Sequence, residues 1–444
     1  MLARRDGRTY LISDQRYKRV NIQSNEIPFL ISNDGFLVCI PIGKDMPIIG
    51  ITASRRVGKT ITLHSFKDRV YWYTNTGCIF ISDYQNETKN YHLPNDSFLL
   101  ELLKITKEKP IGLPKIHIYP NTNSLKEENL PPDSIKTSLP VLELIKYPES
   151  YFELKNSAMY LRNLYPKFEE INKNEGTISM ENIENVINEH LAGNSMDKKV
   201  REGFENLKTK IIESFKDIAS DGSLDIDLDL KERFGRVTTY LNVKKDGKEY
   251  WDYIFVGLVR AGLFPIFMTE DLLQKRKWEN YISFIVNKIF NSIKNDKELK
   301  EKGLLLFIDE MERIFKKSRK KNAQRSIAGD SFVNIAKIGG PNRVGMIYTN
   351  LNYSELDDEL ISNTKYMIVL QHTSDKEVKL IQKDFTFEKR YVQTILNLKK
   401  LEAMAFTKEK FVKYNLITGE KVTDTEPVIG RILPPLSYPQ PPGD

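Results

Sequence analysis

Cysteine and histidine are scarce in this sequence. The 444 residues include 2 cysteines, Cys39 and Cys78, which both lie in apolar stretches, and 5 scattered histidines. Two such thiols do not make a disulfide scaffold, and no cysteine or histidine spacing matches a zinc site. We therefore expect buried free thiols and a reducing compartment, the cytoplasm.

Long apolar runs are also missing. The first residues, MLARRDGRTYLISD, lack the apolar core of a signal peptide. The most apolar window, residues 253–268, contains Arg260 and Pro265, and it is shorter than the roughly 20 residues that a membrane helix needs. The sequence predicts no membrane segment, and this window is interpreted as protein core.

Charge is only mildly unbalanced. Lys and Arg total 67 against 60 Asp and Glu, so the formal net charge is +7, and the pI is near 8.9. This balance is compatible with nucleic-acid binding but does not require it. A composition of 40% hydrophobic and 29% charged residues is typical of a globular protein. The length of 444 residues is enough for two domains, or for one domain with an insertion.

Residues 47–66, PIIGITASRRVGKTITLHSF, predict a short strand, a loop and the start of a helix. The loop follows the phosphate-binding pattern A-x-x-x-x-G-K-T, in which backbone amides and the helix N-terminus surround phosphate. Lys59 is predicted to reach the β- and γ-phosphates of ATP, and the Thr60 hydroxyl to bind Mg²⁺. Ala53 replaces the usual first glycine, so the pattern alone also permits a chance match. The predicted nucleotide-binding residues are Ala53, Ser54, Arg55, Arg56, Val57, Gly58, Lys59, Thr60, Ile61 and, from a later strand, Asp83.

A second motif, GLLLFIDE at residues 303–310, predicts a buried parallel strand that ends in two carboxylates. Asp309 is expected to hold Mg²⁺ through water, and Glu310 to act as the general base on the attacking water. The next strand, residues 344–348, leads to Asn350. That residue either orients the water or senses the γ-phosphate, or is an ordinary turn residue.

Asp83 follows a predicted strand at residues 78–81. The order strand, phosphate loop, helix and strand predicts a βαβ unit, which would place Asp83 beside the P-loop strand near the nucleotide. A polar residue that merely ends a strand explains the same spacing.

The fold predicted from these patterns is α/β, with a mostly parallel sheet, a helical insertion and a small β-rich N-terminal segment. A hairpin is expected at Asn33-Asp34-Gly35 and another within residues 239–256. Residues 58–67 and 275–293 are expected to be helices, and 200–218 to be an amphipathic helix that packs in a core or binds a partner. The expected divisions are residues 1–45 (β-rich segment), 46–120 (first part of the core), 121–250 (insertion), 251–433 (second part of the core) and 434–444 (proline-rich tail).

Two basic features have more than one interpretation. Residues 316–325, KKSRKKNAQR, are either a DNA-backbone contact or a solvated surface. Arg343 precedes a strand and is a candidate for an arginine given in trans to a neighbouring subunit, which would stabilise transition-state charge. Arg313, Arg319 and Arg325 compete for that role.

The ordered set of motifs resembles the HerA/FtsK superfamily of DNA-pumping ATPases, and HerA and its archaeal and viral relatives in particular. The resembling segments are IIGITASRRVGKT, CIFISDYQNE, LLLFIDEMERIF, NRVGMIYTNLN with YMIVLQH, and LEAMAF with VIGRILPPLS. The resemblance implies a RecA-like core, Lys59 and Thr60 on nucleotide and Mg²⁺, Asp309 and Glu310 as the Walker B pair, and Arg343 as the trans arginine. It also implies a homo-oligomeric ring, a hexamer, with double-stranded DNA in its channel.

The chain departs from relatives at three places: Ala53 in the P-loop, Arg55 and Arg56 where small residues are usual, and Asn350 where relatives often have Gln. Because the segment before the P-loop strand is short, the N-terminal barrel of cellular HerA is expected to be absent or reduced. That barrel supports docking of a nuclease, so a partner in DNA packaging or transfer becomes as plausible as a nuclease.

The sequence thus predicts an ATPase that translocates double-stranded DNA. The alternative is an AAA-like ATPase that remodels or gates a protein partner without DNA, with the insertion and the proline-rich tail as docking surfaces. A degenerate ATPase that binds nucleotide without turnover is disfavoured, because Lys59, Thr60, Asp309 and Glu310 are all present.

Overall fold

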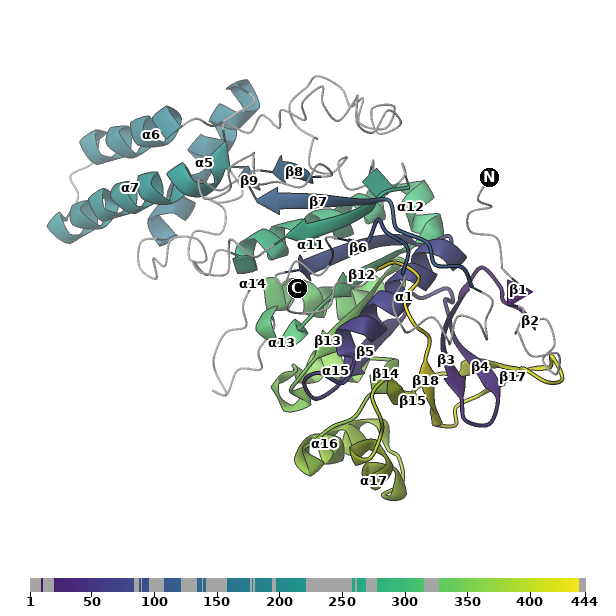
Figure 1. Cartoon of the computed structure of the whole chain (residues 1–444). Helices are drawn as coiled ribbons and strands as arrows, with labels where there is room; N and C mark the ends of the chain where they lie inside the picture. Colours follow the sequence, from purple (N-terminus) through teal and green to yellow (C-terminus); the bar gives the residue numbers. More distant parts are fainter. Residues whose placement is uncertain are drawn as a thin grey trace. The chain divides into compact units, whose positions relative to one another are not determined.

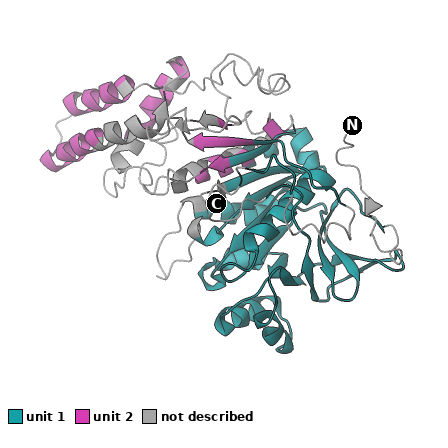
Figure 2. Cartoon of the chain, viewed as in Figure 1, with its two compact units in different colours: residues 1–115, 262–266, 290–444 teal, residues 116–261, 267–289 magenta. Residues whose placement is uncertain are grey.

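The computed structural model divides the chain into two compact units (Figure 2). The first comprises residues 1–115, 262–266 and 290–444, and the second comprises 116–261 and 267–289. The structure describes residues 9–10, 20–83, 88, 90–95, 108–120, 134–137, 139–140, 158–175, 178, 180–193, 197–220, 258–259, 262–268, 278–314 and 327–438. The expected insertion, residues 121–250, lies within the span of the second unit.

Five parallel strands form the centre of the first unit, in the order β14 (Tyr366–Val369), β5 (Ile48–Thr52), β13 (Val344–Asn350), β12 (Leu304–Ile308) and β6 (Gly77–Asp83). The side chains of β5, β12, β13 and β14 are all buried. Continuous apolar strands of this kind are typical of a parallel sheet covered on both faces. The predicted α/β fold is therefore confirmed, and β11 (Phe264–Met268) lies beside β6.

The sheet continues beyond β14 as antiparallel strands, among them the hairpin predicted at residues 33–35. The turn closes through a hydrogen bond from the Gly35 amide to the Ser32 carbonyl of 3.1 Å, with Gly35 at φ 85°. The N-terminal β-rich segment thus extends the core sheet. The antiparallel strands, in spatial order, are β15 (Glu402–Thr407), β18 (Val428–Ile432), β3 (Glu26–Ser32), β4 (Phe36–Pro41), β16 (Phe411–Asn415) and β17 (Lys421–Asp424). A separate pair joins β1 (Thr9–Tyr10) to β2 (Val20–Asn21).

Helix α1 (Lys59–Tyr73) follows the P-loop and packs against β3, β5, β6 and β13 (Figure 1). The expected end at residue 67 was wrong, since the helix runs to Tyr73. The predicted end would place the charged residues Asp68 and Arg69 beyond the helix, yet they lie within it and, like Lys67, are 0% exposed. Their burial requires polar partners, because an unpaired buried charge is strongly destabilising.

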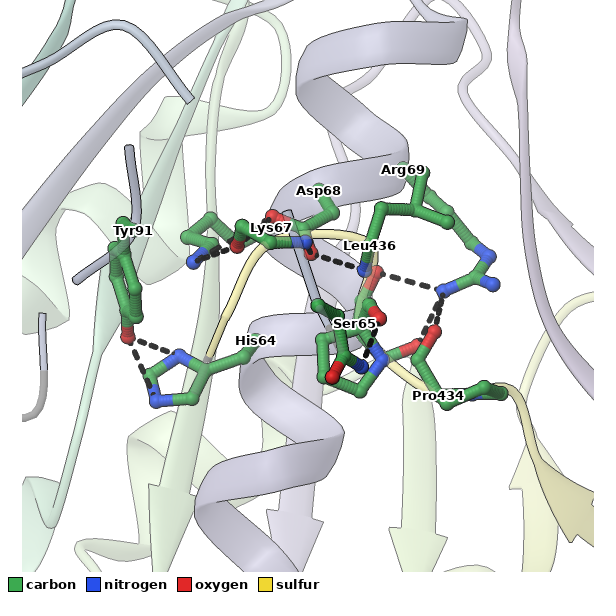
Figure 3. Close-up of polar contacts among 11 residues, drawn as sticks. His64, Ser65, Lys67, Asp68, Arg69, Tyr91, Pro434 and Leu436 are labelled. Atoms are coloured by element: carbon green, nitrogen blue, oxygen red, sulfur yellow. Dashed lines mark hydrogen bonds and ion pairs between the residues drawn. The ribbon is translucent and has the colours of Figure 1, made fainter. Parts of the chain in front are cut away.

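The C-terminal segment supplies many of those partners (Figure 3). Asp68 accepts hydrogen bonds from the backbone amides of Leu436 and Ser437, at 2.6 and 2.8 Å, and from the Ser437 hydroxyl at 2.8 Å. Arg69 donates to the Pro434 carbonyl at 2.9 Å and forms a buried ion pair with Glu108 at 2.7 Å. Residues 434–437 are buried and held against α1, so this part of the predicted proline-rich tail belongs to the core of the first unit.

The remaining described helices include a pair, α16 and α17, that Figure 1 shows beyond β14 and β15. Predicted helix 275–293 corresponds to α11. The bounds are α11 (Trp278–Asn295), α12 (Lys297–Lys302), α13 (Met311–Ile314), α14 (Ile327–Asn334), η4 (Ile335–Gly339), η5 (Tyr353–Glu355), α15 (Asp358–Asn363), α16 (Asp375–Phe385) and α17 (Arg390–Leu396). None of the helices that the structure describes is long and apolar enough to cross a membrane.

The second unit contains three successively packed helices, α5 (Ala158–Glu175), α6 (Met180–Gly193) and α7 (Lys198–Ile218). Helix α7 matches the predicted amphipathic helix, and its Phe204 is buried against the His190 ring of α6. The unit also contains two parallel strand pairs: β7 (Lys115–Pro120) with β8 (Ser134–Thr137), and β9 (Leu139–Pro140) with β10 (Ala219–Ser220). The hairpin predicted within residues 239–256 lies outside the described residues.

Candidate nucleotide site

The P-loop turns sharply into α1 at Gly58. This residue has φ 107°, and a Cβ atom there would overlap the Leu401 side chain. Both the left-handed backbone and the close approach require glycine. Arg56 also has a positive φ, of 64°, which is uncommon for a residue with a side chain. The glycine of the predicted G-K-T pattern therefore has a structural reason in this chain.

Residues near the ends of three strands hold the P-loop through hydrogen bonds. The Ala53 amide donates to the Asn350 carbonyl at 3.3 Å, and the Leu401 amide donates to the Val57 carbonyl at 3.3 Å. The Ser54 hydroxyl makes two hydrogen bonds with Thr373. It pairs with the Thr373 hydroxyl at 3.1 Å and accepts the Thr373 amide at 2.9 Å. The loop is thus anchored to β13, to the end of β14 and to the start of β15.

Lys59 is the buried cation of the site. Its side chain is 7% exposed, and its Nζ lies 3.7 Å from Glu310 Oε1. Within the described part of the chain this Nζ has no hydrogen-bond acceptor. A buried ammonium normally requires several acceptors, so Lys59 is poised to receive an anion.

The two Walker B carboxylates follow β12 and are joined to β13 through Thr349. The Thr349 hydroxyl donates to Asp309 Oδ1, while the Glu310 amide donates to the Thr349 hydroxyl at 2.8 Å and to Asp309 Oδ1 at 3.0 Å. Glu310 has φ 48°, a conformation concentrated at functional sites. Sequence reasoning missed Thr349; a polar residue just before Asn350 in an otherwise apolar strand was its only signal.

Asn350 ends β13 directly beside the P-loop strand. Its Cα is in register with Thr52, the last residue of β5. The side chain is 0% exposed, and neither its Nδ2 nor its Oδ1 has a hydrogen-bond partner among the described residues. A buried amide without partners is costly, which favours a binding role over that of a turn residue.

Glu312 is a third carboxylate that sequence reasoning missed. It is 4% exposed and accepts a hydrogen bond from the Leu351 amide at 2.8 Å through Oε1. Burial raises its pKa, which the nearby Lys59 partly lowers and Glu310 raises. Glu312 lies within the family-like segment LLLFIDEMERIF, but that resemblance assigned no role to it, because a glutamate after Asp-Glu-Met has no recognisable spacing.

The parallel register explains this assembly. Ile308 of β12 is opposite Tyr348 of β13, so Asp309 comes next to Thr349 at the carboxyl edge. Side chains from the carboxyl ends of parallel strands meet at one edge, where α/β proteins bind ligands. The site thus brings Lys59, Asp309, Glu310 and Asn350 to one edge of the sheet, and their roles with nucleotide stay predictions.

Asp83 lies at the same edge but not beside the P-loop strand. Its strand, β6, is separated from β5 by β12 and β13. The expected neighbourhood of β6 and β5 was therefore wrong, because consecutive strands of a crossover need not be adjacent in the sheet. The role of Asp83 in binding nucleotide stays a prediction.

Arg343 occupies the opposite edge, just before β13. Its guanidinium donates to the carbonyls of Gly43, at 2.5 Å, and Lys44, at 3.0 Å, and to that of Glu301 at 3.4 Å. Partial burial lowers its pKa, against the effect of Asp45. Within its own chain Arg343 fastens the start of β13, and a role in trans stays a prediction.

The two unusual P-loop arginines, Arg55 and Arg56, are both exposed. They do not fold back into the core of their own chain. The competing arginines and the basic run at residues 316–325 lie where no side chain is described.

The residues present fit a phosphate ligand with a magnesium ion. The buried Nζ of Lys59, which has no acceptor among the described residues, matches a phosphate oxygen, and Thr60 is the second residue of α1, directly after Lys59. No group of three or more His, Cys, Asp or Glu suited to a metal occurs among the described residues. Mg²⁺ needs no such group, since it is usually held by one or two protein ligands, phosphates and water.

Comparisons with known proteins agree with this fold. VirB4 of Thermoanaerobacter pseudethanolicus aligns over 91% of this chain and 96% of its own, at 15% identity and a TM-score of 0.52. The chain has the fold of VirB4. That is the RecA-like P-loop fold expected from the HerA/FtsK resemblance.

Two further solved structures align less closely. The bacterial conjugative coupling protein TrwB covers 91% of this chain and 89% of its own at 12% identity, with a TM-score of 0.49. The genome packaging NTPase B204 of Sulfolobus turreted icosahedral virus 2 covers 37% and 67% at 16% identity, with a TM-score of 0.22. No protein-family model and no curated protein matches the sequence.

Proposed function

We propose that this chain is an ATP-hydrolysing motor that translocates double-stranded DNA as a homo-oligomeric ring, a hexamer, in the cytoplasm. One observation carries the ATPase part: Lys59, buried and without a hydrogen-bond acceptor in the described residues, lies 3.7 Å from Glu310. The VirB4 fold and the ordered HerA/FtsK-like motifs support the motor part, and the net charge of +7 is compatible with a DNA track.

Each side chain has a distinct task in this proposal. Lys59 binds the β- and γ-phosphates, and Thr60 and Asp309 hold Mg²⁺, which neutralises phosphate charge. Thr349 fixes Asp309 through its hydroxyl. Glu310 accepts the proton of the attacking water, and Asn350 orients that water or the γ-phosphate.

The ion pair between Lys59 and Glu310 gives the cycle a resting state. While Lys59 faces Glu310 at 3.7 Å, one carboxylate oxygen is paired with this cation and not with the attacking water. Bound phosphates compete for Lys59 and leave Glu310 to the water. Hydrolysis is thereby coupled to occupation of the site.

The test is ATP turnover by the full chain with and without duplex DNA. We expect turnover that duplex DNA stimulates, and a Glu310→Gln variant that binds ATP without hydrolysing it. Turnover unaffected by any DNA, in protein shown to be assembled, would contradict the translocase proposal. That result would favour the alternative, an ATPase that acts on a protein partner.

For the partner protein of this motor we propose only a functional class. A packaging or DNA-transfer component fits the chain as well as a nuclease does. Co-purification of the assembled ring with a protein of each candidate class tests this point. If the ring binds a protein of neither class, the proposal is contradicted.

A further inference from the structure

Glu312 is buried beside the hydrolysis site without an assigned task. Oε1 is occupied by the Leu351 amide at 2.8 Å, while Oε2 has no hydrogen-bond partner in the described portion of the chain. A glutamate that is 4% exposed loses most of its hydration. A purely structural position would more economically hold an apolar residue, so this carboxylate calls for a functional explanation.

The residue that Glu312 holds is adjacent to Asn350. Glu312 fixes the Leu351 amide on one side, and the Asn350 carbonyl accepts the Ala53 amide of the P-loop on the other. The peptide group that joins Asn350 to Leu351 is therefore held through both its carbonyl oxygen and its amide. The side-chain amide of Asn350 is buried and has no partner among the described residues.

Two independent observations thus point to one arrangement. The first is a backbone clamp from the Walker B segment onto the end of β13, and the second is a buried amide that nothing in the described chain satisfies. Removing the Glu312 carboxylate takes this hydrogen bond from the Leu351 amide, which directly follows the last residue of β13, Asn350.

We propose that Glu312 is a positioning residue, which holds Asn350 through the Leu351 amide so that the Asn350 amide recognises the γ-phosphate. Glu312 touches neither nucleotide nor water in this arrangement, and it acts through Asn350. The inference rests on the proposed ATPase function, and it adds the means by which the site distinguishes ATP from ADP.

The substitutions distinguish the hydrogen bond from Leu351 to Glu312 from the negative charge of Glu312. In Glu312→Gln the side-chain carbonyl still accepts the Leu351 amide, whereas in Glu312→Ala the acceptor is lost. Asn350→Ala removes the recognising amide itself. Glu377→Ala is the matched control, because Glu377 also accepts a backbone amide, that of Ser354 at 2.9 Å, in the α16 region of the fold.

The primary readout needs no turnover. Affinities for ADP and for the β,γ-methylene analogue of ATP are measured on the full chain by calorimetry. We expect Glu312→Ala and Asn350→Ala each to lower the preference for the ATP analogue by roughly tenfold, with ADP affinity within about threefold of wild type. Glu312→Gln and Glu377→Ala should keep the wild-type preference.

The double variant Glu312→Ala with Asn350→Ala gives the sharpest test. If Glu312 acts through Asn350, the double variant loses no more preference than either single variant. Additive losses, or a Glu312→Gln variant as impaired as Glu312→Ala, overturn the proposal. If Glu312→Ala does not fold, Glu312→Asp, which is one methylene shorter, takes its place.

Failure of the underlying function gives a different result. Wild-type protein that binds neither ADP nor the analogue overturns the ATPase proposal and this inference with it. Wild-type protein that binds both and prefers the analogue, with unchanged preference in Glu312→Ala, overturns only the role of Glu312.

Discussion

At the scale of single residues, the site is defined by polar groups that the protein leaves incompletely paired. Lys59 Nζ and the Asn350 amide have no hydrogen-bond partner in the described residues, although both side chains are buried. Each such group costs about 1–3 kcal/mol when it is left unsatisfied. The folded protein retains this cost where a ligand is expected to offset it.

Replacing Lys59 by Met should abolish turnover and leave the fold intact. The change removes a buried cation that has no hydrogen-bond acceptor among the described residues, but it also leaves buried Glu310 without this cation at 3.7 Å, so we expect a loss of about 3 kcal/mol with the fold retained. We expect turnover to fall by roughly a hundredfold or more, as when a transition-state donor is removed. The measurements are steady-state hydrolysis and thermal unfolding.

Lys408→Met is the control for that substitution. Lys408 is an exposed lysine that donates to the carbonyls of Ile361 and Ser362, at 3.0 and 3.2 Å. Its loss should leave turnover within about twofold of wild type. Equal turnover in Lys59→Met and wild type would refute the assigned site.

Stability should fall with acidity because of His372. Burial lowers the pKa of His372 to about 4, and its Nε2 pairs with the Thr52 hydroxyl at 3.1 Å. The unfolded chain, with a pKa near 6.5, binds more protons than the folded chain below that pH, so stability is lost as the pH falls. We expect this residue to contribute about 2 kcal/mol of loss between pH 7.5 and 5.

The check is denaturant unfolding at both pH values in wild type and His372→Gln. The variant should lose less stability on acidification than wild type. Both proteins should still lose some stability on acidification through His64. Burial lowers the pKa of this residue too, and Lys67 adds to the shift. Equal pH dependence in the two proteins would refute the role of His372.

At the scale of elements, α1 links the P-loop to the C-terminal segment. Its N-terminus carries Lys59, and its last turns carry Lys67, Asp68 and Arg69, all fully buried. Figure 3 shows Asp68 and Arg69 pointing to Leu436 and Pro434, and Tyr91 meeting His64. The helix therefore joins the phosphate loop to the side chains that hold residues 434–437.

Replacing Asp68 by Ala should destabilise the protein severely. The change removes the acceptor of the Leu436 and Ser437 amides and leaves Lys67, 3.5 Å away, without its carboxylate. We expect a loss of about 3 kcal/mol or more, measured by urea unfolding.

Lys302→Ala provides the contrast. The ion pair of Lys302 with Glu298 is exposed, so its loss should cost no more than about 0.5 kcal/mol. If Asp68→Ala unfolds at the same urea concentration as Lys302→Ala, the C-terminal segment does not fasten α1.

Sequence patterns predicted these elements unevenly. The P-loop strand and the Walker B strand were predictable because buried parallel strands are continuous apolar runs with site residues at their ends. The full length of α1 was not, since the partners that allow Lys67, Asp68 and Arg69 to be buried come from distant residues such as Glu108 and Ser437.

The same limit applies to the site. Asp309, Glu310 and Asn350 have recognisable motif positions. Thr349 and Glu312 instead make contacts between the residues that follow β12 and the end of β13, and the parallel register of these strands brings them together. The order of strands, with β12 and β13 between β6 and β5, is likewise absent from sequence spacing.

At the scale of the whole molecule, the proposal requires the chain to hold DNA by its phosphate backbone. Backbone binding releases counterions, so the logarithm of affinity should fall linearly with the logarithm of salt concentration, by about 0.9 per phosphate contact. Duplex binding is measured by fluorescence anisotropy over a salt series. Affinity that does not change with salt would exclude this mode of contact.

The most direct test of the central claim is displacement of a third strand from a DNA triplex by the assembled protein. A motor that moves along duplex DNA removes the third strand only while it hydrolyses ATP. We predict displacement by wild type with ATP, and none with the β,γ-methylene analogue or in Glu310→Gln. ATP hydrolysis by an assembled, DNA-bound protein without any displacement would contradict the account.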